Sequence, residues 1–193
     1  MHPSEAKLGE APGFLRSEHR ETVTNWWLAV QGGANTPNWD IACTASIGGR
    51  DGLILVEAKA HDKELKAEGK PDGGNAANRA RIAAAIDEAN RGLNAILPGW
   101  GLSRDSHYQL SNRFAWSWKI ASLGIPVILV YLGFLHAEEM CDVGTPIADA
   151  DAWVRLVKDY GRGIVPEAAW EEELLVNGTP VRPLIRSLRL DLE

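Results

Sequence analysis

The sequence predicts an α/β fold, and three observations lead to this expectation. Apolar runs rich in β-branched residues predict strands, and segments whose apolar residues recur every three or four positions predict helices. In chain order these segments run helix, strand, strand, strand, helix, helix, strand, followed by shorter accessory elements. The chain has 193 residues, of which 45% are hydrophobic and 24% charged, which is typical of one globular domain.

The first third of the chain supplies the first helix and three strands of this order. Residues 1–12 are small and polar, so we expect a flexible leader. A helix over Gly13–Thr24 follows. Asn25–Val30 either continues this helix or forms a short strand, and the turn-forming residues QGGANTPN favour a strand that ends there. The runs Trp39–Ile47 and Leu53–Ala60 flank GGRDG, and this pattern is typical of a β-hairpin.

The rest of the chain supplies two helices, a central strand and a C-terminal extension. A helix over Asn78–Leu97 carries one apolar stripe and ends at a Pro-Gly pair, and a second helix covers His107–Leu123. The run Ile125–Leu135 is continuously apolar, which predicts a central strand covered on both faces. Residues 136–193 contain an amphipathic helix near Ala152–Tyr160 and an extended tail, PVRPLIRSLRL, so we expect a helical C-terminal extension with this tail that packs on the core.

Composition and charge exclude several classes of protein. The net charge of −6 and the isoelectric point near 5.4 argue against a purely electrostatic nucleic-acid coat. Cys43 and Cys141 lie far apart, which argues against a disulfide scaffold or a zinc ribbon and fits a reducing cytosol. No apolar run is long enough to cross a bilayer, and the first residues lack a signal region. We therefore expect a cytoplasmic protein without membrane contacts.

Charged residues interrupt the apolar hairpin at its open end. If the loop covers residues 48–51, Asp40 lies opposite Lys59 and Ala42 lies opposite Glu57. Because side chains on a strand alternate between faces, the two acids and the lysine then project from one face. Asp40 and Glu57 would then be diagonal neighbours, about 7–8 Å apart, and two carboxylates at this distance can share a cation. A plain Asp40–Lys59 ion pair would contribute only about 0–1 kcal/mol to stability. A shift of one residue would send Asp40 to the other face and leave a generic α/β protein.

With these residues the chain resembles the PD-(D/E)XK nuclease superfamily, which has the restriction-endonuclease-like fold. The matching segments are PNWD, which ends at Asp40, EAK (Glu57–Lys59), a first helix that bears glutamates, and QLSNR in the later helix. The resemblance covers residues 13–135 and implies an α-β-β-β-α-β core, a mixed central sheet flanked by helices. Two residues separate Pro37 from the aspartate, so the Pro-Asp pair of the family is spread out here.

The resemblance also implies a metal site and its ligands. A hard cation, Mg²⁺ or Mn²⁺, would take oxygen ligands and keep several waters. The implied ligands are Asp40, Glu57, the main-chain carbonyl of Ala58 and, from the first helix, Glu21 or its neighbour Glu18.

The catalytic residues implied by the resemblance are Asp40, Glu57, Lys59 and Gln109. Lys59 would orient a metal-activated water or stabilise charge on the phosphate. Gln109 shares one face of the later helix with Asn112 and Arg113, and an amide and a guanidinium can hold a phosphate.

The function expected from these residues is that of a Mg²⁺- or Mn²⁺-dependent deoxyribonuclease, a phosphodiesterase that acts on DNA. Recognition would involve the loop 61–76 and the C-terminal extension, which could also bind a second copy or a partner subunit. The alternative is a catalytically inactive domain of the same fold that serves as a nucleic-acid-binding or assembly module.

Overall fold

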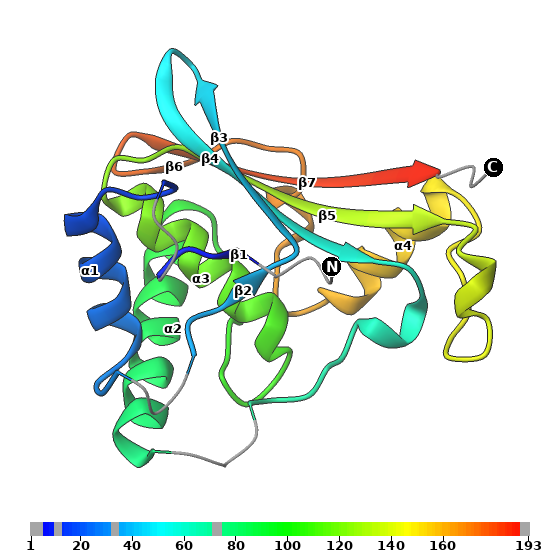
Figure 1. The fold of residues 1–193 in the computed structure, drawn as a ribbon, viewed down its shortest axis with the longest axis horizontal. Helices are drawn as coiled ribbons and strands as arrows, with labels where there is room; N and C mark the ends of the chain where they lie inside the picture. The colour runs from blue at the N-terminus through cyan, green and yellow to red at the C-terminus, as the bar shows by residue number, and fades with distance from the viewer. Residues whose placement is uncertain (1–5, 10–12, 32–34, 71–74, 190–193) are drawn as a thin grey trace.

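The computed structural model describes residues 6–9, 13–31, 35–70 and 75–189, and it confirms an α/β class (Figure 1). A five-stranded mixed sheet has the order β3-β4-β5-β7-β6, and a two-stranded sheet pairs β1 with β2. The strands are β1 (Ala6–Lys7), β2 (Asn38–Trp39), β3 (Ile41–Ile47), β4 (Arg50–Lys59), β5 (Val127–Leu135), β6 (Leu174–Val176) and β7 (Thr179–Arg189). The helices are α1 (Ser17–Trp27), α2 (Ala76–Ile96), α3 (Tyr108–Ser122) and α4 (Ala150–Tyr160), with 3-10 turns at Asp62–Glu64, Glu138–Met140 and Glu167–Ala169.

The helices lie on one side of the five-stranded sheet, and the core fills the space between them (Figure 1). Strands β4, β5 and β7 are parallel neighbours that advance in one direction across the sheet. Because crossover connections between parallel strands are right-handed, successive crossovers in one direction place their helices on the same face. The largest fully buried side chains are Trp27, Trp39, Trp116, Trp153, Tyr131 and Phe114.

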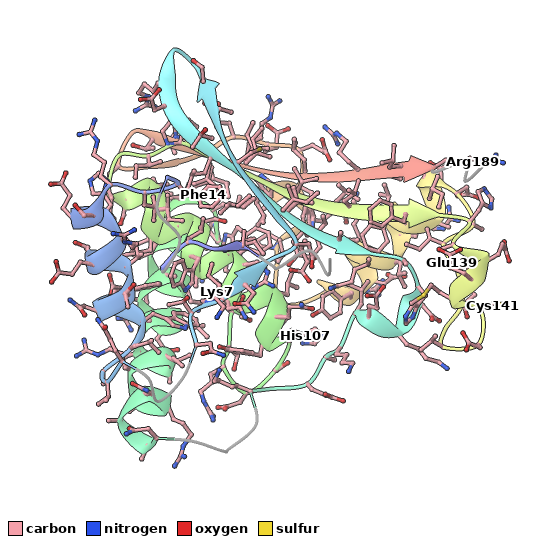
Figure 2. All side chains as sticks on the ribbon, viewed as in Figure 1. Lys7, Phe14, His107, Glu139, Cys141 and Arg189 are labelled. Atoms are coloured by element: carbon pink, nitrogen blue, oxygen red, sulfur yellow. The ribbon has the colours of Figure 1, made fainter. Side chains whose placement is uncertain are left out.

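The other face of the sheet is open, so the expectation of a central strand covered on both faces is wrong. Along β5 the side chains alternate: Leu129 and Tyr131 are buried toward the helices, whereas Val130 and Leu132 are half-buried. Figure 2 shows the side chains of this outer face projecting away from the ribbon with no helix above them. A sheet flanked by helices on both faces is therefore not observed in the described residues.

The hairpin turn is shorter than predicted, and the register differs from the expected one by two residues. Gly48 and Gly49 have φ values of 58° and 76°, which suits the two-residue turn that joins twisted strands, and Ile47 pairs with Arg50. A shift of two residues preserves the face of every side chain. Continuing this register past Ile41↔Val56 places Asp40 beside Glu57 rather than opposite Lys59.

The strand favoured over Asn25–Val30 is wrong, and the alternative is observed, because α1 continues to Trp27. Val23, Trp26 and Trp27 are spaced as on one face of a helix. Because the helix continues through Trp27, both indoles are buried on this face. The main sheet therefore has two strands, β3 and β4, between α1 and α2, where three were expected.

The two ends of the chain are more integrated than expected. Leu8 is fully buried and β1 pairs with β2, so residues 6–9 are not a flexible leader, while residues 1–5 and 10–12 lie outside the described residues. At the other end, β7 pairs with the central strand from Val127↔Val181 to Leu135↔Arg189. The tail is extended, as expected, but the segment predicted as an extension outside the core contributes β6 and β7 to the main sheet. No described helix combines the length and the apolar character that a membrane span requires.

Asn78 joins the end of α1 to the start of α2. Its side chain is buried, its Oδ1 accepts from the N–H groups of Ala29 and Val30 at 2.8 Å each, and its Nδ2 donates to the Val30 carbonyl at 2.9 Å. Three polar main-chain groups next to the core are therefore satisfied by one side chain.

We predict that Asn78→Ala lowers the free energy of unfolding by about 2–4 kcal/mol, because two part-buried main-chain donors and one acceptor lose their shared partner. Urea unfolding checks this value. The control is Asn25→Ala, since Asn25 is an exposed residue of α1 and its loss should cost less than about 0.5 kcal/mol. Equal losses in the two variants would contradict the role assigned to Asn78.

Candidate functional site

Glu57 is a buried carboxylate at the centre of the candidate site. It lies on the helix-facing side of β4 with 1% of its surface exposed. Its Oε1 accepts from Lys59 Nζ, in a very short ion pair, and from Gln109 Nε2 at 2.6 Å. Its Oε2 accepts from Arg113 Nε at 2.6 Å. A buried charge needs such partners, so these donors explain how a carboxylate is tolerated in the core.

Helix α3 supplies two of these donors because Gln109 and Arg113 are four residues apart on one face. The guanidinium of Arg113 also donates to Asn112 Oδ1 at 2.7 Å and lies 4.7 Å from the centre of the Trp39 ring. These contacts hold Arg113 in one orientation. The helix face that was predicted to carry Gln109, Asn112 and Arg113 is thus directed at Glu57.

Asp40 reaches the site from the bend between β2 and β3, where the main-chain ladder between β3 and β4 has ended. Its Oδ2 accepts from the Ala58 N–H at 2.7 Å and replaces a strand partner there. Partial burial of the carboxylate end raises the pKa of Asp40, the Ala58 N–H lowers it, and the charge of Glu57 raises it. The two acids therefore lie close enough to repel each other.

A cavity of about 620 Å³ brings these residues together. Asp40, Glu57, Ala58, Lys59 and Gln109 all line it, as the sequence predicted for a common site. A larger cavity of about 980 Å³ lies between the start of α1 and the hairpin turn, but Asp51 is the single carboxylate among its described lining residues. The smaller cavity is therefore the better candidate for metal chemistry.

One wall of this cavity comes from the loop 61–76, which was expected to take part in recognition but was not assigned to the metal site. Glu64, Lys66, Glu68 and Lys70 follow β4 and line the cavity together with Asp40 and Glu57. Their spacing of two residues could have indicated an extended segment with one side directed at the site. The cavity thus contains lysines as well as acids.

Glu21 is not brought to this site. It is exposed on α1 and is absent from the described lining of the cavity, and the same holds for Glu18. Helix α1 packs against α2 and α3, away from the edge where Asp40 leaves β3. The structure therefore groups Asp40, Glu57 and Ala58 without a glutamate from the first helix.

The chemistry of these groups fits a hard cation with few protein ligands. Glu57 has about four lone-pair positions, of which three accept the donors described above, and Asp40 uses one oxygen for Ala58 N–H. The N–H and C=O of an extended residue face the same edge, so the Ala58 carbonyl is directed to the edge where Asp40 lies. Within the described ranges, no group of three or more His, Cys, Asp or Glu side chains is suited to hold a metal ion. A cation here would take two carboxylates, one carbonyl and waters.

In comparisons with known proteins, no family model, no curated protein and no solved structure matches this chain.

We predict that Glu57→Gln lowers the free energy of unfolding by about 3–5 kcal/mol, because Lys59 and Arg113 would remain buried without a compensating charge. Urea unfolding measures the loss. Glu173→Gln is the matched control, since Glu173 is exposed and its change should cost less than about 0.5 kcal/mol. A loss from Glu57→Gln no larger than that of the control would contradict the network.

We predict that Asp40→Asn changes how stability depends on pH. The folded pKa of Asp40 is raised, so the folded state binds its proton more tightly than the unfolded state, whose pKa is about 3.8. Wild-type stability therefore falls relative to the variant as the pH rises from 3.8 through the folded pKa. Urea unfolding from pH 4 to pH 7 measures the difference between the two proteins. A difference that does not change over this range would show that the pKa of Asp40 is not raised.

Proposed function

We propose that the protein is a Mg²⁺- or Mn²⁺-dependent nuclease that hydrolyses phosphodiester bonds of DNA at the cavity around Asp40 and Glu57. The observation that carries the proposal is the convergence of two acids, a lysine and an amide on one cavity. The resemblance of PNWD and EAK to the PD-(D/E)XK superfamily supports the same assignment of roles.

The metal ligands in this proposal are Asp40, the remaining lone pair of Glu57 and the Ala58 carbonyl. A divalent cation, when bound, neutralises charge on the phosphate and lowers the pKa of an attacking water. The carboxylate of Asp40 is already fixed by the Ala58 N–H, so binding a cation requires little rearrangement of this ligand.

The nitrogen donors of the site have capacity left for the substrate. Lys59 has three N–H donors and Gln109 has two, and each uses one for Glu57 in the contacts described. In the proposed reaction Lys59 donates to the attacking water or to a phosphate oxygen, and Gln109 holds a second oxygen. Arg113 is a positioning residue, because it fixes the orientation of Glu57.

One observation favours a second candidate function, that of a catalytically inactive domain of the same fold that serves as a nucleic-acid-binding or assembly module. Both oxygens of Glu57 are engaged by Lys59, Gln109 and Arg113, so the carboxylate is satisfied without a metal. A cation must therefore compete with two buried positive charges for this ligand.

We predict that the purified protein nicks plasmid DNA in Mg²⁺ or Mn²⁺, and that Asp40→Ala and Lys59→Ala each reduce the rate by about 10²–10⁴-fold. Agarose electrophoresis of the plasmid measures the rate. Lys59→Ala should still bind metal by calorimetry, because both acids remain, whereas Asp40→Ala should bind it more weakly.

The control for these variants is Lys63→Ala, since Lys63 is exposed and outside the cavity lining. Its nicking rate should match that of the wild type. If the wild-type protein neither cleaves single- or double-stranded DNA nor binds metal, the inactive module is correct. Cleavage by Lys59→Ala at the wild-type rate would exclude the role given to Lys59.

A further inference from the structure

Lys70 places a positive charge on the wall of the cavity that follows β4. Its ammonium donates to the Tyr108 hydroxyl at 3.0 Å and lies 4.6 Å from the centre of the Tyr108 ring. Both residues line the same cavity as Asp40 and Glu57. The ammonium therefore faces the proposed active site from a wall other than the one formed by β4.

Within the described part of the chain, this ammonium forms no ion pair with a carboxylate. Lys70 is also half-buried. Burial lowers the pKa of Lys70, and the nearby charge of Arg104 lowers it further. A cation held in this way costs free energy, and an anion in the cavity would offset that cost.

The main chain fixes the position of Lys70. Its N–H donates to the Arg104 carbonyl at 2.8 Å, and the Tyr108 N–H donates to the Glu68 carbonyl at 3.0 Å. His107, labelled in Figure 2 at the start of α3, donates its N–H to the Ala67 carbonyl at 2.9 Å. The segment before Lys70 is therefore joined to the segment that begins α3, and the charge is preorganised.

We propose that Lys70 and the Tyr108 hydroxyl bind a phosphate group of a nucleic-acid strand that neighbours the phosphate to be cleaved. This inference rests on the proposed function. Lysine binds phosphate as a point charge, and a tyrosine hydroxyl adds a donor. Burial raises the pKa of Tyr108 to about 12, so its hydroxyl keeps its proton at neutral pH. Lys59 and Arg113 are engaged with Glu57. Of the two other lysines that line the cavity, Lys66 is exposed, whereas Lys70 is half-buried and held by the Tyr108 hydroxyl, so Lys70 is the better placed for the neighbouring phosphate.

The test compares wild type, Lys70→Met, Lys70→Arg and Lys63→Met in their binding of fluorescein-labelled DNA oligonucleotides, single- and double-stranded. Fluorescence anisotropy in EDTA gives Kd at several salt concentrations without cleavage. We expect Lys70→Met to raise Kd about five- to tenfold and to reduce the slope of log Kd against log salt by about 0.7–0.9, the loss of one phosphate contact. Lys70→Arg should restore most of the affinity, and Lys63→Met should behave as wild type.

Kinetics and stability separate this role from others. In nicking assays Lys70→Met should raise KM with kcat unchanged, since the contact is made equally in ground and transition states. Its melting temperature should be equal to or above that of the wild type, because a half-buried charge has been removed, whereas a lysine retained for stability would give a lower value.

The outcomes are distinguishable. If wild type binds and cleaves DNA while Lys70→Met matches it in Kd, salt slope and KM, the phosphate site is wrong and the nuclease stands. If inorganic phosphate binds wild type in a Lys70-dependent manner but neither oligonucleotide binds, the site takes free phosphate and the proposal is wrong. If wild type binds neither DNA nor metal and does not cleave, the proposed function fails together with this inference.

Discussion

The carboxylate of Glu57 and its donors are the constraint on which the site depends. A buried negative charge in a strand is tolerated only when its partners are in place, and these come from β4 itself and from α3. The same contacts that stabilise the charge therefore fix α3 against the sheet. The contacts that pack the helix on the strands are thus also contacts of the site.

This constraint places stability in opposition to the proposed binding of a metal. Lys59 and Arg113 neutralise Glu57 in the absence of a cation, and the same neutralisation weakens the attraction of the carboxylate for a metal. Asp40 is different, because it is exposed and its nearest described donor is a main-chain N–H. A site of this kind would use Asp40 to capture the cation and Glu57 to complete its coordination.

Sequence patterns predicted the elements whose signals are local. The apolar stripe of α2, the start of α3 and the run that forms β5 all lie within a few residues of the expected positions. The expected loop of the hairpin was too long, but the parity of the strands survived, so Asp40 and Glu57 still share a cavity. Local periodicity is sufficient for such features because it is set by the pleat and the helical turn.

Features that depend on tertiary contacts could not be predicted in this way. The first part of Asn25–Val30 is helical because the indoles of Trp26 and Trp27 are buried in the core when α1 continues through them. The segment of β7 was assigned to an extension because its partner strand, β5, is distant in sequence. Glu21 was expected in the site, but the packing of α1 leaves it in solvent. The segment containing Lys70 was expected to take part in recognition, but its place beside the acids could not be predicted, since its main-chain partners near α3 lie more than thirty residues away.

The anchoring of Asp40 to a peptide group, rather than to a side chain, has a consequence for how the protein can change. The Ala58 side chain alternates with that of Glu57 along β4, so like those of Ile54 and Val56 it lies on the outer face of the sheet. The contact with Asp40 is made by the main-chain N–H of Ala58 and not by this side chain. A larger or more polar side chain at position 58 would therefore change the outer surface of the sheet but keep the hydrogen bond that holds Asp40. Proline is the exception, because it has no hydrogen to give.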